Sequence, residues 1–241
     1  MKNYFLIGSL ICVLSSCTEG MENLDGRTGK ESVGLKEKSG NKAGPENAAN
    51  PFDDAGKLHN ELLEAYCLLP NRSESHVVAG VDSLAQLNVT FNGLLEKPFQ
   101  GTDASRVGAI AGSGFIDLEL AVAASAMSAY GKASLVSFAD DLMLLYGTED
   151  DFDAVHAFII SYEMSVLGDA ALTVVDKKTI LVTASITRYA AYASKKKPKK
   201  NTDPEWDLMV GHIIASVDGA GTGVADAVLM ALSVGIVENM D

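Results

Sequence analysis

The histidines are the first side chains to examine for metal or acid–base chemistry. There are four of them, His59, His76, His156 and His212. No two are three or four positions apart, so no single helix can present the two-histidine pair of a helical metal site. We therefore predict neither a metal site nor a cofactor, and we place each histidine at a helix surface or at the edge of the core.

Two carboxylates are flanked by apolar residues. Glu119 lies between Leu118 and Leu120, and Asp226 lies between alanines. Burial raises the pKa of a carboxyl group and is a cue for a catalytic acid, so one hypothesis is a hydrolase that uses Glu119. The alternative is that both carboxylates lie on the polar faces of their helices. Because no Gly-x-Ser-x-Gly motif is present, we assign no catalytic residue and do not predict an enzyme.

The start of the chain has the order of a secretory signal peptide, which we assign to residues 1–16. Lys2 precedes a short apolar run that ends in small residues. This run is shorter than the roughly 20 apolar residues of a membrane-spanning helix. The ending Leu14-Ser15-Ser16-Cys17 resembles the lipobox of bacterial lipoproteins. That resemblance implies cleavage before Cys17 and diacylation of its thiol. It places the exported chain in the bacterial cell envelope, at the outer membrane, with its lipid as the membrane contact.

Residues 17–50 are rich in Gly, Glu, Lys, Asn and Ser and carry few large apolar side chains. Such a segment buries too little apolar surface to offset the entropy of ordering it, so we predict a disordered linker behind the lipidated Cys17. The net charge of −13 argues against nucleic acid as a partner. Cys67 stands in an apolar stretch, and we predict that it is a small buried hydrophobic residue.

Residues 51–241 show apolar positions at helical spacing, with no lasting alternation of the kind that marks strands. We predict an all-α domain, a single bundle of six to eight helices. Pro70, Gly131 and Gly147 are expected to end or separate helices. The expected helices cover residues 53–69, 75–94, 115–130, 135–146, 152–166, 176–192, 205–217 and 224–237, with a loose Gly-rich stretch at 99–113.

Small residues recur every four positions near the C-terminus. They are Gly219, Gly223, Ala227, Ala231 and Gly235. This spacing allows helices to approach closely, either within a protein core or within a membrane. A carboxylate in the bilayer centre costs about 2.5–3.5 kcal/mol on insertion scales, and Asp218 and Asp226 interrupt this run. A tightly packed buried hairpin is therefore favoured over a membrane-inserting one.

Two short stretches resemble uncharacterised lipoproteins of the Bacteroidetes type. Residues 50–60, Asn-Pro-Phe-Asp-Asp-Ala-Gly-Lys-Leu-His-Asn, are similar to the Asn-Pro-aromatic-Asp-x-x-Gly-x-x-His-Asn motif of those proteins. Residues 177–189 are similar to a later helix that ends in Ala-Arg-Tyr, and the Gly/Ala-rich C-terminal helices also fit. The resemblance implies the envelope location and the helical fold, and it implies no mechanism.

These observations favour a non-enzymatic envelope lipoprotein whose helical domain is a structural module or binds a protein or small molecule. The alternative is a secreted, bacteriocin-like protein that is membrane-active through its Gly/Ala-rich C-terminal helices.

Overall fold

Hydrophobic periodicity produces helices throughout the part of the chain that the structure describes. The computed structural model describes residues 44–70, 72–148, 151–195 and 205–239. These residues form ten α-helices and one short 3₁₀ helix. The elements are α1 (Asp53–Cys67), η1 (Glu74–His76), α2 (Val77–Gln86), α3 (Val89–Leu94), α4 (Ala104–Ile110), α5 (Phe115–Ala124), α6 (Ala129–Thr148), α7 (Phe152–Gly168), α8 (Val174–Lys195), α9 (Glu205–Ala220) and α10 (Val224–Glu238).

The core is built around the C-terminal hairpin of α9 and α10. Every residue of α10 from Val224 to Ile236 is buried except Asp226, which is half-buried. α10 packs along α9 and also contacts α1, α2, α4 and α8. The two helices approach closely at Gly219, where a Cβ atom would lie 2.5 Å from the Cα of Ala227. The small residues therefore let the backbones meet inside the protein.

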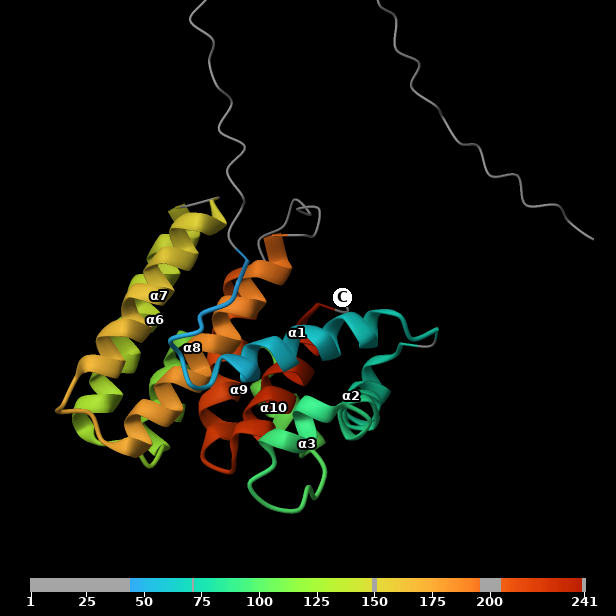
Figure 1. Cartoon of the computed structure of the whole chain (residues 1–241). Helices are drawn as coiled ribbons and strands as arrows, with labels where there is room; N and C mark the ends of the chain where they lie inside the picture. The colour runs from blue at the N-terminus through green and yellow to red at the C-terminus, as the bar shows by residue number, and fades with distance from the viewer. Residues whose placement is uncertain (1–43, 71, 149–150, 196–204, 240–241) are drawn as a thin grey trace, which may run out of the picture. The chain divides into compact units, whose positions relative to one another are not determined.

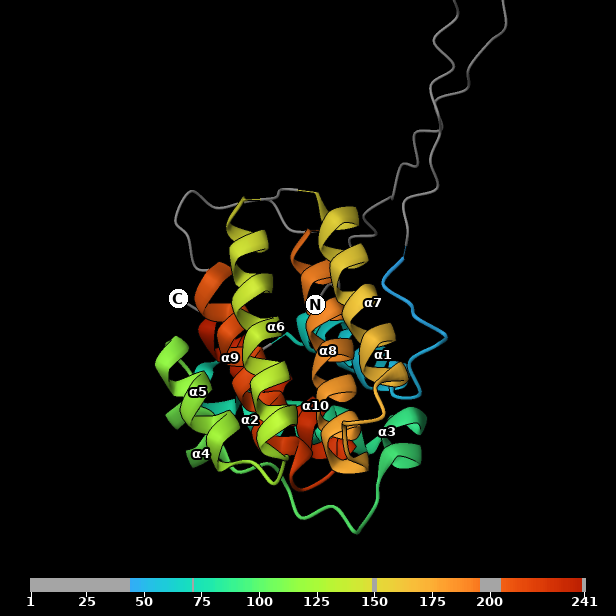
Figure 2. The same ribbon diagram turned by 90° about the vertical axis from the view of Figure 1, so that its left-hand side faces the viewer.

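The other helices enclose this hairpin. In Figure 1, α1 crosses in front of α8, with α2 and α3 beside α10. Figure 2 shows the long helices α6, α7 and α8 upright and side by side. Between α6 and α7 the ring of Phe138 stacks on Tyr162 at a centroid separation of 4.1 Å. The all-helical prediction is confirmed for the described residues.

The expected number of six to eight helices is too low, because polar caps interrupt two stretches of the chain. The side chain of Asn88 accepts a hydrogen bond from the Phe91 amide, which ends the continuous helix expected over 75–94 and starts α3. The stretch at 99–113, expected to be loose, contains α4. Its N-terminus is capped by Asp103, which accepts from the amides of Ser105 and Arg106.

Gly131 does not separate two helices, contrary to expectation, and Gly147 does not end one. Both lie inside α6, and the helix expected over 115–130 ends at Ala124. Gly131 instead allows α6 to approach Asp176 of α8 closely, since a Cβ there would lie 2.4 Å from the carboxyl carbon of Asp176. That buried carboxylate accepts from the amide and hydroxyl of Ser128 and from the amide of Thr173, so it joins the start of α6 to the start of α8.

The described fold begins before residue 51, where the helical domain was expected to start. Asn47 and Asn50 are 8% and 3% exposed, so the last residues of the expected linker belong to the folded part. The signal peptide at 1–16, Cys17 and the linker up to residue 43 lie outside the described residues. Thr202, Asp203 and Pro204, which form a capping pattern typical of a helix start, also lie outside the described residues.

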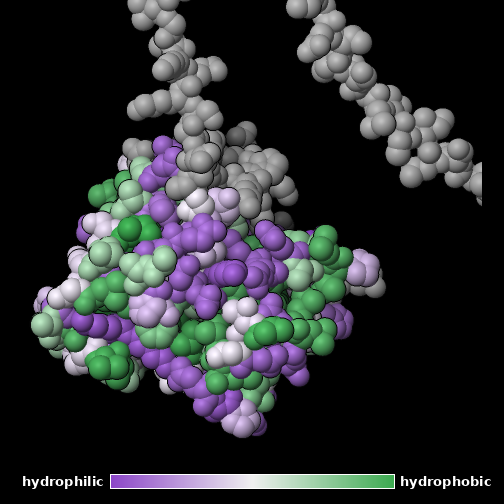
Figure 3. All heavy atoms as spheres, viewed as in Figure 1, coloured by the Kyte–Doolittle hydropathy of each residue, from purple (hydrophilic) through white to green (hydrophobic). Residues whose placement is uncertain are grey.

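The surface of the domain is mixed in polarity. On the face seen in Figure 3, hydrophilic residues run along α1, and hydrophobic residues gather over its C-terminal end and over α2. Leu68 and Leu87, which directly follow α1 and α2, are among the most exposed apolar side chains. The amphipathic pattern therefore breaks at the helix ends.

Substitution of Gly219 by Ala tests the close packing of the hairpin. Alanine favours a helix more than glycine does, but here its Cβ would meet backbone atoms that cannot move aside. We expect the free energy of unfolding, measured by urea denaturation, to fall by about 1–3 kcal/mol.

Gly221→Ala is the matched control, because the nearest atom to its Cβ would be 3.4 Å away. Equal stability of the two variants would contradict the packing of α9 on α10.

Candidate functional site

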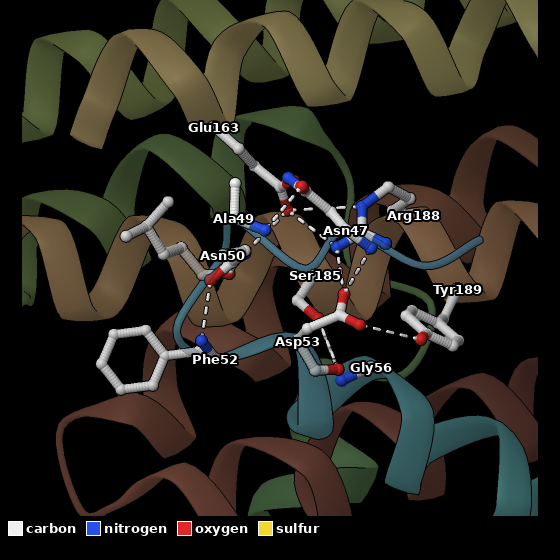
Figure 4. A network of polar contacts seen from close by, with 11 residues as sticks. Asn47, Ala49, Asn50, Phe52, Asp53, Gly56, Glu163, Ser185, Arg188 and Tyr189 are labelled. Atoms are coloured by element: carbon white, nitrogen blue, oxygen red, sulfur yellow. Dashed lines mark hydrogen bonds and ion pairs between the residues drawn. The ribbon is translucent and has the colours of Figure 1, made fainter. Parts of the chain in front are cut away.

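A buried ion pair links α7 to α8. Arg188 and Glu163 are both fully buried, and the Nη2 of Arg188 donates to the Oε1 of Glu163 over 3.1 Å. Burying charges costs several kcal/mol per ion unless partners surround them. Figure 4 shows polar side chains from the N-terminal segment converging on this pair.

The N-terminal segment supplies amide donors to Glu163. The Nδ2 atom of Asn47 donates to Oε2 over 2.6 Å, and the Nδ2 atom of Asn50 donates to Oε1 over 2.8 Å. Asn50 also donates to the carbonyl oxygen of Leu181 on α8. Both oxygens of the buried carboxylate are therefore satisfied, and the chain before α1 is fixed against α7 and α8.

Asp53, the first residue of α1, completes the network. Its Oδ1 accepts from the Nη2 of Arg188 over 2.7 Å, and its Oδ2 accepts from the hydroxyl of Tyr189 over 3.1 Å. Burial raises the pKa of Tyr189, and the neighbouring Asp53 carboxylate raises it further. Tyr189 therefore remains a neutral donor to Asp53.

Residues of the motif at 50–60 also hold α1 against α8. The amide of Gly56 donates to the hydroxyl of Ser185, and a Cβ at Gly56 would lie 2.4 Å from the ring of Tyr189. The Nδ2 atom of Asn60 donates to the carbonyl oxygen of Tyr189 over 3.0 Å. Thus the two stretches that carry the resemblance, 50–60 and 177–189, are in contact. Their polar residues hydrogen-bond with one another and with Glu163 of α7, while the Nη1 atom of Arg188 has no partner among the described residues.

A pocket of about 340 Å³ opens beside this network, with walls from α1, α8, α9 and α10. Its apolar wall includes Leu63, Ala190, Leu232 and Ile236. Polar groups come from His59, His212, Ser194 and Asn239 and from Arg72 between α1 and η1. A concave, half-apolar site with a few convergent polar groups is the usual form of a small-molecule site.

His59 and His212 face each other in this pocket. They come from α1 and α9, are 1% and 4% exposed, and meet edge to face with ring centroids 5.1 Å apart. Gly235 of α10 lies directly against the His212 ring, where no Cβ could be placed. Burial lowers the pKa of His59 to about 3, and the neighbouring His212 lowers it as well, so His59 is neutral at ordinary pH.

Cys67 is exposed and lines the same pocket, so the prediction of a buried cysteine is wrong. It is the last residue of α1, and the adjacent Leu68 is also exposed. Cys67 and His59 are eight positions apart on one helix, which is about 12 Å along its axis. The imidazole therefore cannot act as a base for this thiol in the observed geometry.

The structure places the residues of the predicted small-residue face together. Gly219, Gly223, Ala227, Ala231 and Gly235 are all buried in the α9–α10 hairpin, and Gly235 also lines the pocket. Cys17 lies outside the described residues.

The candidate acids lie apart from the pocket. Glu119 is exposed on α5, which argues against the buried acid of the hydrolase hypothesis. Asp226 is half-buried, and burial raises its pKa although Lys97 opposes this. Within the described residues, no group of three or more histidine, cysteine or acidic side chains could hold a metal ion.

Sequence reasoning treated the histidines separately and missed their pairing. His59 and His212 are distant in the chain and meet only because α1 and α9 both pack around α10.

Comparison with known proteins gives no match: no family model, no curated protein and no solved structure is similar to this chain.

Replacing Glu163 with Gln tests the buried network. The variant keeps the shape of the side chain but leaves the buried Arg188 with Asp53 as its remaining carboxylate partner. Breaking a buried ion pair costs about 3–5 kcal/mol, and we expect the free energy of unfolding to fall by this amount in urea denaturation.

The control is Glu96→Gln, which breaks the more exposed ion pair with Lys178. It should change the free energy of unfolding by about 1 kcal/mol or less. If Glu163→Gln were no more destabilising than this control, the network would not hold the fold.

Proposed function

We propose that this protein is an exported lipoprotein of the bacterial envelope whose helical domain binds a small molecule in the histidine pocket. The pocket beside His59 and His212 is the observation that carries the binding function. It is concave, half-apolar and fixed by helices on each side.

Binding fits the pocket better than catalysis does. None of the described residues that line it is acidic, so His59 has among them no carboxylate of the kind that orients a catalytic base. The thiol of Cys67 is two helical turns from His59, which separates nucleophile from base. The groups that converge in the pocket are suited to hold a molecule in place.

The anchor rests on the sequence of residues 1–17. Lys2, the short apolar run and the small residues before Cys17 support export and acylation, and the chain's negative charge would not attract it to anionic lipids. We propose the outer membrane as its location. Nucleic acid is not among the proposed partners, because the net charge of −13 opposes phosphate binding.

Replacing Cys17 with Ser tests the anchor in cells that produce the protein. We expect the wild-type chain to incorporate radiolabelled palmitate and to sediment with membranes. The Cys17→Ser variant should lose both properties, because it lacks the thiol that receives the lipid.

Cys12→Ser is the matched control, since Cys12 lies within the segment that is removed. It should leave labelling and sedimentation unchanged. Labelling that persists in Cys17→Ser would contradict the proposed anchor.

The α9–α10 hairpin favours a second candidate function, a bacteriocin-like membrane activity. α10 is apolar around almost its whole circumference, as expected of a helix in a protein core or in a membrane. In the described structure no helix combines the length and the apolar character needed to cross a bilayer. Insertion would therefore require this hairpin to leave the core that it forms.

A liposome assay separates the two candidates. We expect the mature chain carrying Cys17→Ser, which has no lipid, to release no dye from phosphatidylethanolamine–phosphatidylglycerol liposomes at neutral pH, because its hairpin stays in the core. Release by this unlipidated chain would favour the membrane-active function over the binding module.

A further inference from the structure

We propose that the groove between α6 and α7 binds a basic amphipathic helix of a partner protein. This surface is separate from the histidine pocket, whose walls come from α1, α8, α9 and α10. The inference follows from three observations: an open groove with aromatic rings in its walls, hydroxyl groups that are engaged within it, and a negative charge on both helices that form it.

The groove has a volume of about 400 Å³, and its described lining residues all come from α6 and α7. These two helices lie side by side (Figure 2) and both contact α8. Along α6 the lining runs from Tyr130 to Asp141, which is about 16 Å of helix. Ser137, Asp141 and Ser161 are exposed, so both walls are open to solvent. A helix of about three turns fits such a groove better than a small molecule, which proteins usually enclose.

Aromatic rings provide the apolar part of the groove. Phe138 stacks on both Phe158 and Tyr162, with ring centroids 5.7 Å and 4.1 Å apart. Phe138 is buried, whereas Phe158 and Tyr162 are only half-buried and can contact a bound molecule. Leu144 lies one turn beyond Asp141 on α6 and is 69% exposed, so it extends the apolar surface. An apolar helix stripe at spacings of three and four residues could cover these side chains.

Several hydroxyl groups of the groove already have partners. The hydroxyls of Ser134 and Tyr162 share a hydrogen bond of 3.0 Å, and Ser165 donates to the carbonyl oxygen of Tyr162. The hydroxyl of Tyr130 donates to the carboxylate of Asp169 over 2.9 Å. Because these groups are engaged, a ligand gains more from covering the rings than from hydrogen bonds to these hydroxyls.

The charge of the two helices selects a cationic partner. Residues 133–176 contain no lysine or arginine. Asp140 and Asp141 on α6 and Asp151 and Asp153 at the start of α7 are exposed, and Asp141 lines the groove. A helix with lysine or arginine beside its apolar stripe complements this surface. A second copy of the chain would bring the same acidic helices to the groove, so self-association there is opposed by like charge.

Three synthetic peptides of about 15 residues test this inference. The first has leucine at helical spacing and lysine at the other positions. The second has glutamate in place of lysine, and the third has the residues of the first in an order without an apolar face. We expect the mature chain carrying Cys17→Ser to bind the first peptide about tenfold more tightly than either of the others in isothermal titration calorimetry. In NMR spectra the amide signals of α6 and α7 should shift most.

The variant Ser161→Trp fills the groove from an exposed position on α7. It should weaken binding of the first peptide about tenfold, because the indole occupies the space of the peptide side chains. Ser83→Trp is the matched control, since Ser83 is an exposed serine of α2 that does not line the groove. It should leave the affinity unchanged.

A second pair of variants tests the charge. Replacing Asp140 and Asp141 together with Asn should weaken binding about three- to tenfold, as expected for the loss of two surface ion pairs. The control is Asp54→Asn with Glu64→Gln, which removes the same charge from exposed positions on α1. This control should bind the peptide as the parent chain does.

The outcomes decide between occupants. Equal binding of the first and third peptides would assign the affinity to net charge alone and overturn the groove as a helix site. Binding that is unaffected by Ser161→Trp would also overturn it. The chain has a cationic run of its own, the five lysines at 195–200. If replacing these lysines with glutamine raised the affinity for the first peptide about tenfold, that run would be the occupant and a partner helix would not. None of these variants alters a residue that lines the histidine pocket, so the proposed function is tested separately.

Discussion

The buried pair of Arg188 and Glu163 is the interaction on which the remaining structure depends. Two charges in the interior are tolerated only when polar partners surround them. Asn47, Asn50 and Asp53 provide partners for both oxygens of Glu163 and for the Nη2 atom of Arg188 from a single short segment. As a result the chain before α1 is fixed to α7 and α8, and α1 starts at a defined position. The Nη1 atom of Arg188 has no hydrogen-bond partner among the described residues. We call this network the clamp, because its hydrogen bonds join α1, α7 and α8 to the N-terminal segment.

The clamp determines where the pocket forms. Because Asp53 and Asn60 both bind α8, the face of α1 that carries His59 is directed toward α9 and α10. Close approach at Gly219 and Gly235 brings α9 and α10 together and seats His212 beside His59. The hydrogen bonds of the motif therefore fix the positions of the helices that form the pocket walls. The polar residues of the motif serve the fold, and His59 serves both the fold and the pocket.

Helical periodicity was sufficient to predict the all-α fold and most of the long helices, because a continuous apolar face is a local property of the sequence. The extra helices depend on single side chains, such as Asn88 and Asp103 at the starts of α3 and α4, which a periodic pattern does not reveal. The site depends on contacts between distant segments. In the sequence, Glu163 is indistinguishable from the other polar residues of an amphipathic helix. The spacing of the histidines in the chain does not indicate that His59 and His212 are in contact.

Native mass spectrometry of the mature protein, extracted from the envelope of the producing cell, tests the central claim most directly. We expect a chain that starts at Cys17, carries acyl groups, and retains a small molecule that is released on denaturation and is absent from the His59→Phe variant. A chain recovered without acyl groups and without any bound molecule would contradict the proposed lipoprotein and its binding function.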